Sequence, residues 1–440
     1  MKFPKKGTPR EAVTARMREY RDKDARAEDA RLFSLVYFTR PDILEVARDA
    51  YNAFFSENAL NPMAFPSLRR METEVVSMTL SMLNAPEGAA GTMSSGGSES
   101  LLLAVKTARD WARVERPNVT APEMILPVTA HPALLKAAHT VGIKPIVAPT
   151  TPAFTVDLDF VKRSLNDNTI LLVGSAPQYA HGVLDPIADL GRLAEERNIL
   201  CHVDACIGGF VLPWVDKLGY AVPPWDFRVK GVTSISADVH KYGYAAKGAS
   251  TVLYRSRALR KHQFFAHGDW PGGLFASPSI LGTRPGGAIA AAWAVMNYLG
   301  EEGYLDLARR AMAATKGIVS AVRDIPGLHV IGEPVASIIA IGGDDSLDLY
   351  VLAEKMEARG WRLDKQQHPP SLHLTISPAH DQVVDQLAAD LATFTKEAQE
   401  AKARGEQPQG SAAMYGMLGS LPDRTAVNQA LVDFMDALDA

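Results

Sequence analysis

The sequence lacks the features that mark several large classes of protein. Only two cysteines, Cys201 and Cys206, occur in 440 residues, and we interpret both as reduced core thiols rather than a disulfide or a metal site. No stretch offers about 18 uninterrupted apolar residues, and the longest candidate, 287–299, is too short to span a bilayer. The 46 basic and 50 acidic residues give a net charge of −4, which argues against a general nucleic-acid-binding protein.

The amino-terminal sequence also lacks the pattern of a targeting segment. Residues 1–10 are basic, but residues 11–30 mix both charges densely and contain no apolar run of the kind that a signal peptide has. We therefore expect a soluble, cytoplasmic protein with no signal peptide and no transmembrane anchor. A hydrophobic content of 47% in a chain of this length is enough for a large core, divided between a major and a minor domain.

The order of apolar segments predicts an α/β protein in three parts. Residues 1–56 have the pattern of charged helices followed by an irregular apolar stretch. In residues 57–310, short apolar strands alternate with helical patterns, as a mostly parallel sheet requires. Residues 311–440 combine strands with amphipathic helices, which predicts a smaller carboxyl-terminal α+β domain. The strands expected from their apolar runs are 123–128, 169–173, 199–203, 337–342 and 373–376.

A His-Lys pair at His240 and Lys241 is the most informative local feature. It follows the apolar segment 232–236, so both side chains are expected just beyond the carboxyl end of a strand, where open α/β sheets place their ligands. An amine that is kept partly neutral there can bind an aldehyde. By itself the pair is a weak signal, because most lysines in loops are solvated surface residues.

Two upstream segments strengthen this interpretation. The apolar strand 199–203 ends on Asp204, and a carboxylate in that position would keep a proton on the ring nitrogen of a pyridine cofactor. Gly97 and Ser98 lead into a helical pattern that begins near Leu101, and the first amides of such a helix can bind a phosphate. The plain alternatives are helix caps at both places. Their occurrence in one chain upstream of Lys241 favours cofactor binding.

These three elements make the chain similar to the sphingosine-1-phosphate lyases, within the group II decarboxylase-like enzymes that use pyridoxal 5′-phosphate. The resemblance extends nearly from end to end, and the block 227–248, with its second lysine, points to the lyase branch. It implies a fold-type I architecture and a Schiff base between the cofactor and Lys241. The segments that carry the resemblance are 65–76, 94–100, 177–186, 203–210, 227–248, 269–278, 282–287 and 414–417.

The resemblance also assigns roles to residues of the cofactor site. His131 matches the histidine that stacks on the cofactor ring, whereas its plain alternative is a residue at a helix start. Lys247 matches a lysine that binds the substrate phosphate or assists proton transfer, although in most proteins it would be a surface charge. Tyr179 is expected in the site, while His181 either joins it or fixes its loop through a hydrogen bond. The residues expected to bind the cofactor are Lys241, Asp204, His131, Gly97, Ser98, His240 and Ser236.

The remaining assignments concern the substrate and a second subunit. Tyr37 falls where the family has a tyrosine that reaches the neighbouring subunit's site, so the resemblance implies a homodimer with shared active sites. Asn58 and Asn61 are expected near the substrate phosphate, but Asn61 stands where these lyases usually have histidine. An amide cannot carry positive charge, so phosphate affinity or its pH dependence is expected to differ. Residues 282–287 either approach the cofactor phosphate from the partner chain or form a turn before an Ala-rich helix.

The function implied is a carbon–carbon lyase that cleaves phosphorylated sphingoid bases into a long-chain aldehyde and phosphoethanolamine. The base for the substrate 3-hydroxyl is Lys247, Tyr179 or an oxygen of the substrate phosphate. The nearer alternative is an amino-acid decarboxylase on the same fold, which needs no such base. The more distant alternative, a non-catalytic protein that binds sphingoid phosphates, would not need Lys241 and Asp204.

Overall fold

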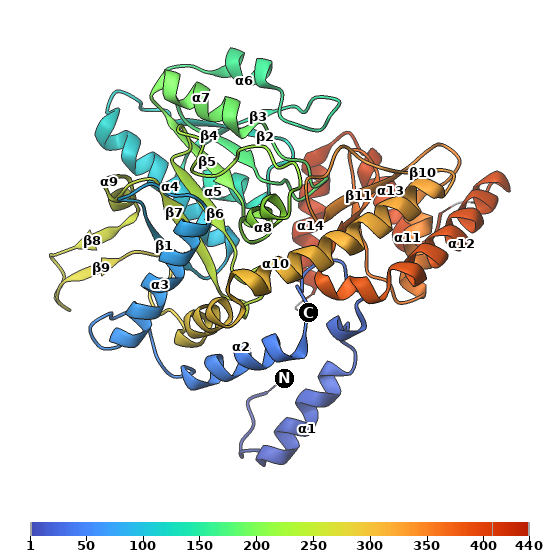
Figure 1. The fold of residues 1–440 in the computed structure, drawn as a ribbon, viewed down its shortest axis with the longest axis horizontal. Helices are drawn as coiled ribbons and strands as arrows, with labels where there is room; N and C mark the ends of the chain where they lie inside the picture. The colour runs from blue at the N-terminus through green and yellow to red at the C-terminus, as the bar shows by residue number, and fades with distance from the viewer. Residues whose placement is uncertain (1, 407, 439–440) are drawn as a thin grey trace.

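In the computed structural model, which describes residues 2–406 and 408–438, a seven-stranded sheet forms the centre of the larger half of the molecule (Figure 1). The strand order is β1-β7-β6-β5-β4-β2-β3. All pairs from β6 to β3 are parallel, whereas β7 runs antiparallel to both β1 and β6. The strands are β1 (Ala90–Ser94), β2 (Glu123–Pro127), β3 (Lys144–Ala148), β4 (Thr169–Ser175), β5 (Leu200–Asp204), β6 (Ser234–Ala237) and β7 (Ser250–Tyr254).

Helices cover both faces of this sheet, which explains why its central strands are continuous apolar runs. Every residue of β4 and β5 is buried. Helices α4 and α5 share one core with the sheet, while α7, α8 and the first part of α10 (Gly286–Asp324) share the core on the other face. The helices of this half are α4 (Gly97–Glu115), α5 (Ala133–Val141), α6 (Leu158–Ser164), α7 (Ile187–Arg197), α8 (Leu212–Lys217) and α9 (Arg257–Arg260).

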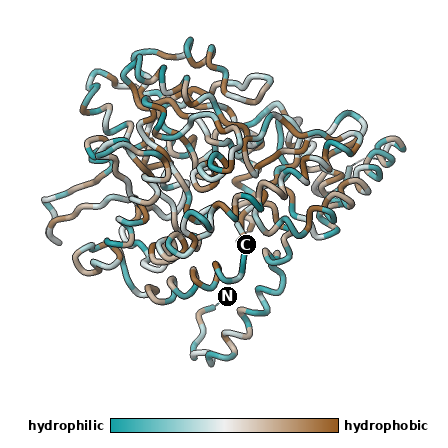
Figure 2. The backbone as a smooth tube through the Cα atoms, in the orientation of Figure 1, coloured by the Kyte–Doolittle hydropathy of each residue, from teal (hydrophilic) through white to brown (hydrophobic). Residues whose placement is uncertain are grey.

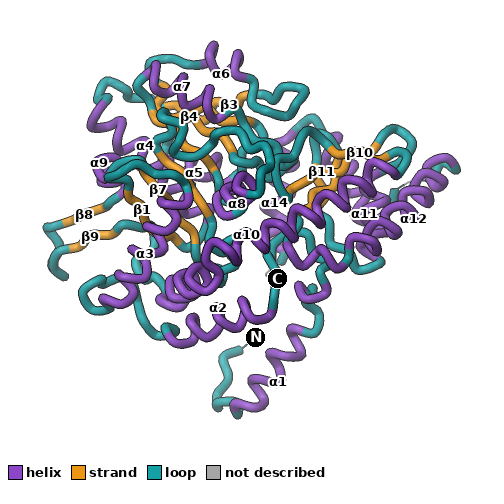
Figure 3. The backbone as a smooth tube through the Cα atoms, in the orientation of Figure 1, coloured by secondary structure: helices purple, strands orange, loops and turns teal. Residues whose placement is uncertain are grey.

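The smaller half is built on a four-stranded antiparallel sheet of order β10-β11-β13-β12. Figure 3 shows its strands as a second group, apart from the large sheet. The mostly parallel large sheet and the smaller α+β unit expected from the sequence are thus both present. The elements are β10 (Leu328–Val330), β11 (Ile338–Gly343), β12 (Asp364–Gln366), β13 (Ser371–Thr375), α11 (Leu349–Ala358), α12 (Val384–Ala403), α13 (Gly410–Ser420) and α14 (Arg424–Ala437).

A long helix, α10 (Gly286–Asp324), connects the two halves (Figure 1). It is interrupted at Gly300, whose φ of 55° and ψ of −171° are not helical. Its residues contribute both to the core of the large sheet and to that of the small sheet. Residue 310, the domain boundary expected from the sequence, lies in the part of α10 that follows the interruption at Gly300.

The amino-terminal helices differ in how they are covered. α1 (Arg10–Arg21) has no buried residue and stands away from the rest of the molecule, and much of it is hydrophilic (Figure 2). α2 (Pro41–Ala53) and α3 (Pro66–Met82) pack against α10. A hairpin of β8 (Phe265–His267) and β9 (Phe275–Ser277) also projects outward (Figure 1). Within residues 2–406 and 408–438, no helix has both the length and the apolar character of a membrane span.

Candidate active site

A cavity of about 210 Å³ lies at the carboxyl edge of the large sheet. It forms where β4, β5 and β6 end and where α4 begins, at the edge where parallel α/β sheets bind ligands. The structure thus brings together chain segments that are far apart in sequence. The predicted site residues that line it are Gly97, Ser98, His131, Tyr179, Asp204, His240 and Lys241.

Lys241 forms an ion pair that was not predicted from the sequence. Its Nζ lies 3.0 Å from Oδ2 of Asp238, whose side chain is 1% exposed. Burial lowers the pKa of Lys241, but the Asp238 carboxylate outweighs burial and raises this pKa above the usual lysine value. Burial also opposes ionisation of Asp238, yet the Lys241 ammonium holds its pKa below the usual value. The only signal in the sequence was that Asp238 and Lys241 are three residues apart. A tight turn brings these two residues together.

The first turn of α4 presents unpaired amides next to this ion pair. The amides of Glu99 and Ser100 bond to the carbonyl of Gly96. Among the residues that the structure describes, the amides of Gly97 and Ser98 make no hydrogen bond. Free amides and the helix dipole together favour an anion such as a phosphate group.

Two further observations fit a phosphate at the start of α4. A Cβ on Gly97 would lie 2.8 Å from Asp238 Oδ2 and 3.0 Å from Cys206 Sγ, so only glycine lets the helix begin this close to the cavity. His240 lies next to Gly96, and its buried Nδ1 has no hydrogen-bond partner in the described part of the chain. A phosphate would supply acceptors for the helix amides and for this ring. The residues present therefore fit the cofactor phosphate expected from the sequence.

Asp204 and His131 also lie where a cofactor ring would need them. Asp204, at the end of β5, is 7% exposed and lines the cavity. Its Oδ1 accepts the Cys206 amide at 3.1 Å, and its Oδ2 has no hydrogen bond among the described residues. His131 lines the open side of the cavity, with its Nδ1 accepting the Ala133 amide at 3.2 Å. This arrangement fits a carboxylate for a ring nitrogen and an imidazole beside the ring.

Ser236 and His181, which were both predicted as site residues, do not line this cavity. Ser236 is fully buried within β6, where its hydroxyl bonds to His202 Nε2 and accepts the Cys206 thiol, both at 3.3 Å. It lies behind the cavity and is not among the lining residues, so its contact with the cofactor stays a prediction. His181 is 3% exposed, and its Nδ1 pairs with Gln178 Oε1 at 3.2 Å. Burial lowers the pKa of His181 to about 4, so its neutral ring holds its loop through this hydrogen bond, and its contact with substrate stays a prediction.

Lys247 and Tyr37 line a second cavity, of about 360 Å³, that adjoins the first through His240. The Lys247 ammonium donates to the His240 carbonyl at 3.2 Å and lies 5.3 Å from the centre of the Tyr37 ring. The Lys247 side chain is exposed by its surface area, but its ammonium is crowded by protein, and this burial, followed by the charge of Lys241, lowers its pKa to about 8. Tyr37 packs against Tyr242 of its own chain, so within one chain it lies beside that chain's own site, and its reach into a neighbouring subunit's site stays a prediction.

Tyr179 is held by the smaller half of the molecule. Its hydroxyl donates to Asp364 Oδ2 at 2.6 Å, and its ring stacks on His373 with the centres 4.0 Å apart. Burial, and then the bond to Asp364, raise the pKa of Tyr179 above its usual value. The phenolate form is therefore disfavoured, which argues against Tyr179 as the base for a substrate hydroxyl.

Asn58 and Asn61 do not line the cofactor cavity of their own chain. Asn58 Oδ1 accepts the amides of Leu60 and Arg284, at 2.9 and 3.3 Å. Asn61 Oδ1 accepts the Met63 amide at 3.0 Å and thus caps a local turn before α3. Within a single chain, both side chains bond to backbone amides outside the cavity, and their contact with a substrate phosphate stays a prediction.

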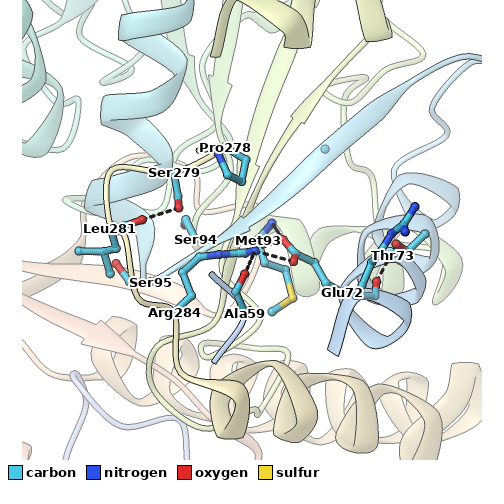
Figure 4. Close-up of polar contacts among 12 residues, drawn as sticks. Ala59, Glu72, Thr73, Met93, Ser94, Ser95, Pro278, Ser279, Leu281 and Arg284 are labelled. Atoms are coloured by element: carbon cyan, nitrogen blue, oxygen red, sulfur yellow. Dashed lines mark hydrogen bonds and ion pairs between the residues drawn. The ribbon is translucent and has the colours of Figure 1, made fainter. Parts of the chain in front are cut away.

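Arg284 joins the turn 282–287 to the segment before α3. Its guanidinium bonds to both carboxylate oxygens of Glu72, at 2.8 and 3.0 Å, and to the carbonyl of Ala59 at 3.1 Å (Figure 4). Glu72 also accepts the amide of Met93, on the outer edge of β1. Residues 57–61 and 282–287 therefore form one unit on the surface, outside the cofactor cavity.

Comparisons with known proteins agree with this geometry. The family model described as "Pyridoxal-dependent decarboxylase conserved domain" matches residues 29–341. The sphingosine-1-phosphate lyase of Oryza sativa subsp. japonica is 46% identical over 395 residues, covering 88% of this chain and 72% of that protein. Sphingosine-1-phosphate lyase 1 of Rattus norvegicus is 40% identical over 440 residues, covering 99% of this chain and 76% of that protein.

A solved structure extends the similarity to three dimensions. The sphingosine-1-phosphate lyase of Burkholderia pseudomallei K96243 superposes with a TM-score of 0.88 at 40% identity, over 92% of this chain and 94% of that one. The fold-type I architecture predicted from the sequence is therefore confirmed.

Replacing Gly97 with alanine is expected to weaken binding of pyridoxal phosphate about tenfold or more. The new methyl group would contact the Asp238 carboxylate and the Cys206 sulfur, and overpacking a buried site costs about 1 to 3 kcal/mol. Equilibrium titration of cofactor-free protein, followed by absorbance, measures the dissociation constant. Gly7→Ala is the matched control, because it also introduces a methyl group, has no atom within 4 Å and does not replace a glycine with positive φ. Equal affinities in the two variants would show that the start of α4 does not hold the phosphate.

Proposed function

Because this chain belongs to the pyridoxal-dependent decarboxylase family, and within it to the sphingosine-1-phosphate lyases, we propose that it cleaves phosphorylated sphingoid bases. The products are a long-chain aldehyde and phosphoethanolamine. The observation that carries the proposal is the position of Lys241, in one cavity with Asp204 and the first amides of α4. A protein that only bound the lipid would not need this arrangement.

Different residues of the chain would bind different parts of the cofactor. Bound pyridoxal phosphate supplies an electron sink for cleavage of a bond at the carbon that carries the substrate amine. Lys241 would bind its aldehyde, and the start of α4 with His240 would hold its phosphate. Asp204 would keep the ring nitrogen protonated, and His131 would lie against the ring.

Lys247 is our candidate for the base that takes the proton from the substrate 3-hydroxyl. With a pKa of about 8, an appreciable fraction of Lys247 is a neutral amine near physiological pH, and a base with such a pKa is well matched to proton transfer. Tyr179 is less suited, because its pKa is raised. The protonated fraction of Lys247 would attract the substrate phosphate, as the family resemblance implies.

We further propose a homodimer with shared active sites. Apolar side chains are exposed in residues 55–63, which include part of the surface unit, and in the hairpin β8–β9. They are Phe55, Leu60, Met63, Phe265, Trp270 and Leu274. Leu274 is 90% exposed, and exposure of an apolar side chain to water is unfavourable. Burial of this side chain against a partner surface would remove that cost. In such a dimer the unit of 57–61 and 282–287 would face the partner's cavity, and Asn58 and Asn61 would meet substrate there. Cytoplasmic location stays a prediction.

We expect the protein loaded with pyridoxal phosphate to convert a phosphorylated sphingoid base to a long-chain aldehyde and phosphoethanolamine. Mass spectrometry of both products measures the reaction. The unphosphorylated base is the control and should react poorly, because Lys247 then has no phosphate to bind. Release of carbon dioxide from an amino acid, with no aldehyde formed from the lipid, would identify the alternative decarboxylase.

Turnover is expected to rise with pH through about 8, because a lysine with that pKa becomes a neutral base as pH increases. Lys247→Ala should keep the bound cofactor and lose about 10²- to 10⁴-fold in kcat, together with this pH dependence. Lys247→Arg is the matched variant, since arginine can bind phosphate but stays protonated. If Lys247→Arg keeps the wild-type kcat and pH profile, Lys247 binds the substrate phosphate and is not the base.

A further inference from the structure

Glu99, in the first turn of α4, joins that helix to a segment 181 residues further along the chain. Its Oε2 accepts the amide and the hydroxyl of Ser95, both at 2.7 Å. Its Oε1 accepts the amides of Ile280 and Leu281, at 2.8 and 3.3 Å. One carboxylate therefore receives four hydrogen bonds from two separate parts of the chain.

Stabilisation of the helix start explains only one of these two oxygens. A glutamate in the first turn of a helix commonly accepts an amide close to the start of that helix, as Oε2 does with Ser95. The helix dipole also favours a carboxylate there. The donors to Oε1, in contrast, lie between β9 and α10. This second set of bonds holds that distant stretch and adds nothing to the helix.

The stretch held by Glu99 is residues 279–285, which we call the outer turn. Within residues 2–406 and 408–438, the amides of Ile280 and Leu281 have no other hydrogen-bond partner. Their side chains are 51% and 41% exposed, so packing against a core does little to fix them. Ser279 Oγ donates to the Leu281 carbonyl at 2.9 Å, a bond inside the outer turn itself (Figure 4). Loss of Glu99 would therefore free this half of the outer turn.

The other half of the outer turn is held by the unit of residues 57–61 and 282–287. Asn58 accepts the amide of Arg284 and donates to the hydroxyl of Thr283, both at 3.3 Å. The ion pair with Glu72 anchors the Arg284 side chain. The outer turn is thus held from two sides, by α4 through Glu99 and by the segment that carries Asn58.

The position of Glu99 is not explained by its own cofactor cavity. Glu99 does not line that cavity. A carboxylate in the first turn of α4 would also repel a phosphate bound at the free amides of Gly97 and Ser98. Its four hydrogen bonds hold the carboxylate toward Ser95 and the outer turn instead. These contacts point to a role outside the cavity of its own chain.

We infer that Glu99 is a positioning residue for the active site of the neighbouring subunit. It fixes the outer turn, and the outer turn sets where Asn58 lies relative to the partner's substrate. The inference rests on the proposed homodimer with shared active sites. It goes beyond that proposal by naming a residue that acts across the interface without contacting substrate.

Mixed dimers test whether Glu99 acts on its own subunit or on the partner. A Glu99→Ala subunit and a Lys241→Ala subunit are given different affinity tags, and dimers that carry both tags are purified. The remaining Lys241 then lies beside an outer turn that still has Glu99. We expect kcat/KM for the phosphorylated lipid, per intact Lys241, to be close to that of wild type. In the Glu99→Ala homodimer it should be about 10- to 100-fold lower, because both outer turns are misplaced.

Two further variants control this comparison. Glu99→Asp keeps the charge but shortens the side chain by one carbon, so it can bond to Ser95 without reaching the outer turn. It replaces Glu99→Ala if the alanine variant does not assemble, and the same pattern is expected. Glu115→Ala removes a carboxylate from the other end of α4, and its homodimer should have the kcat/KM of wild type.

Hydrogen exchange of the cofactor-free protein gives a readout that does not depend on activity. Peptides covering residues 279–285 should exchange about tenfold faster in Glu99→Ala than in wild type, because the amides of Ile280 and Leu281 lose their acceptor. Mass spectrometry of these peptides measures the rates. Glu115→Ala should exchange at the wild-type rate.

The outcomes separate this inference from the proposed function. If wild-type dimers cleave the lipid but the mixed dimer is as slow per intact Lys241 as the Glu99→Ala homodimer, only this inference fails. Unchanged exchange of residues 279–285 in Glu99→Ala also overturns it. If sedimentation shows an active monomer, the proposal of shared sites fails, and the inference fails with it. If the wild-type protein does not cleave the lipid, the proposed function itself has failed.

Discussion

The parallel alignment of β4, β5 and β6 is the constraint on which the site depends. Parallel strands end at one edge of the sheet, so the segments that follow them meet there although they are distant in sequence. Asp204 and the turn that carries Lys241 reach the cavity in this way, and α4 contributes its first amides from the same edge. Lys241 and Asp238 both stay charged in this buried site, because an ammonium and a carboxylate that are removed from water stabilise each other.

The parts of the site that could be predicted are those encoded by short local patterns. A carboxylate at the end of an apolar strand, glycines before a helix and a His-Lys pair after a strand predicted Asp204, Gly97 and Lys241, and all three line the cavity. The large sheet could be predicted for the same reason, since its strands are apolar runs that are buried on both faces.

The remaining features depend on contacts that no local pattern encodes. Ser236 turns to His202 because it lies within β6 and not beyond its end. Asn61 accepts a hydrogen bond from an amide of its own turn, and Tyr179 donates one to Asp364, an aspartate of the smaller half. Asp238 lies in the segment 227–248 that resembles the lyases, but its ion pair with Lys241 is seen only in the folded chain.

The central claim is that Lys241 is the residue that binds the aldehyde of the cofactor. Reduction of the loaded protein with borohydride, followed by peptide mapping, measures which lysine carries the pyridoxyl group. We predict the label on Lys241, with Lys247 unlabelled in the same protein. A label on Lys247, or on no lysine, would contradict the assignment of the cavity and of the chemistry built on it.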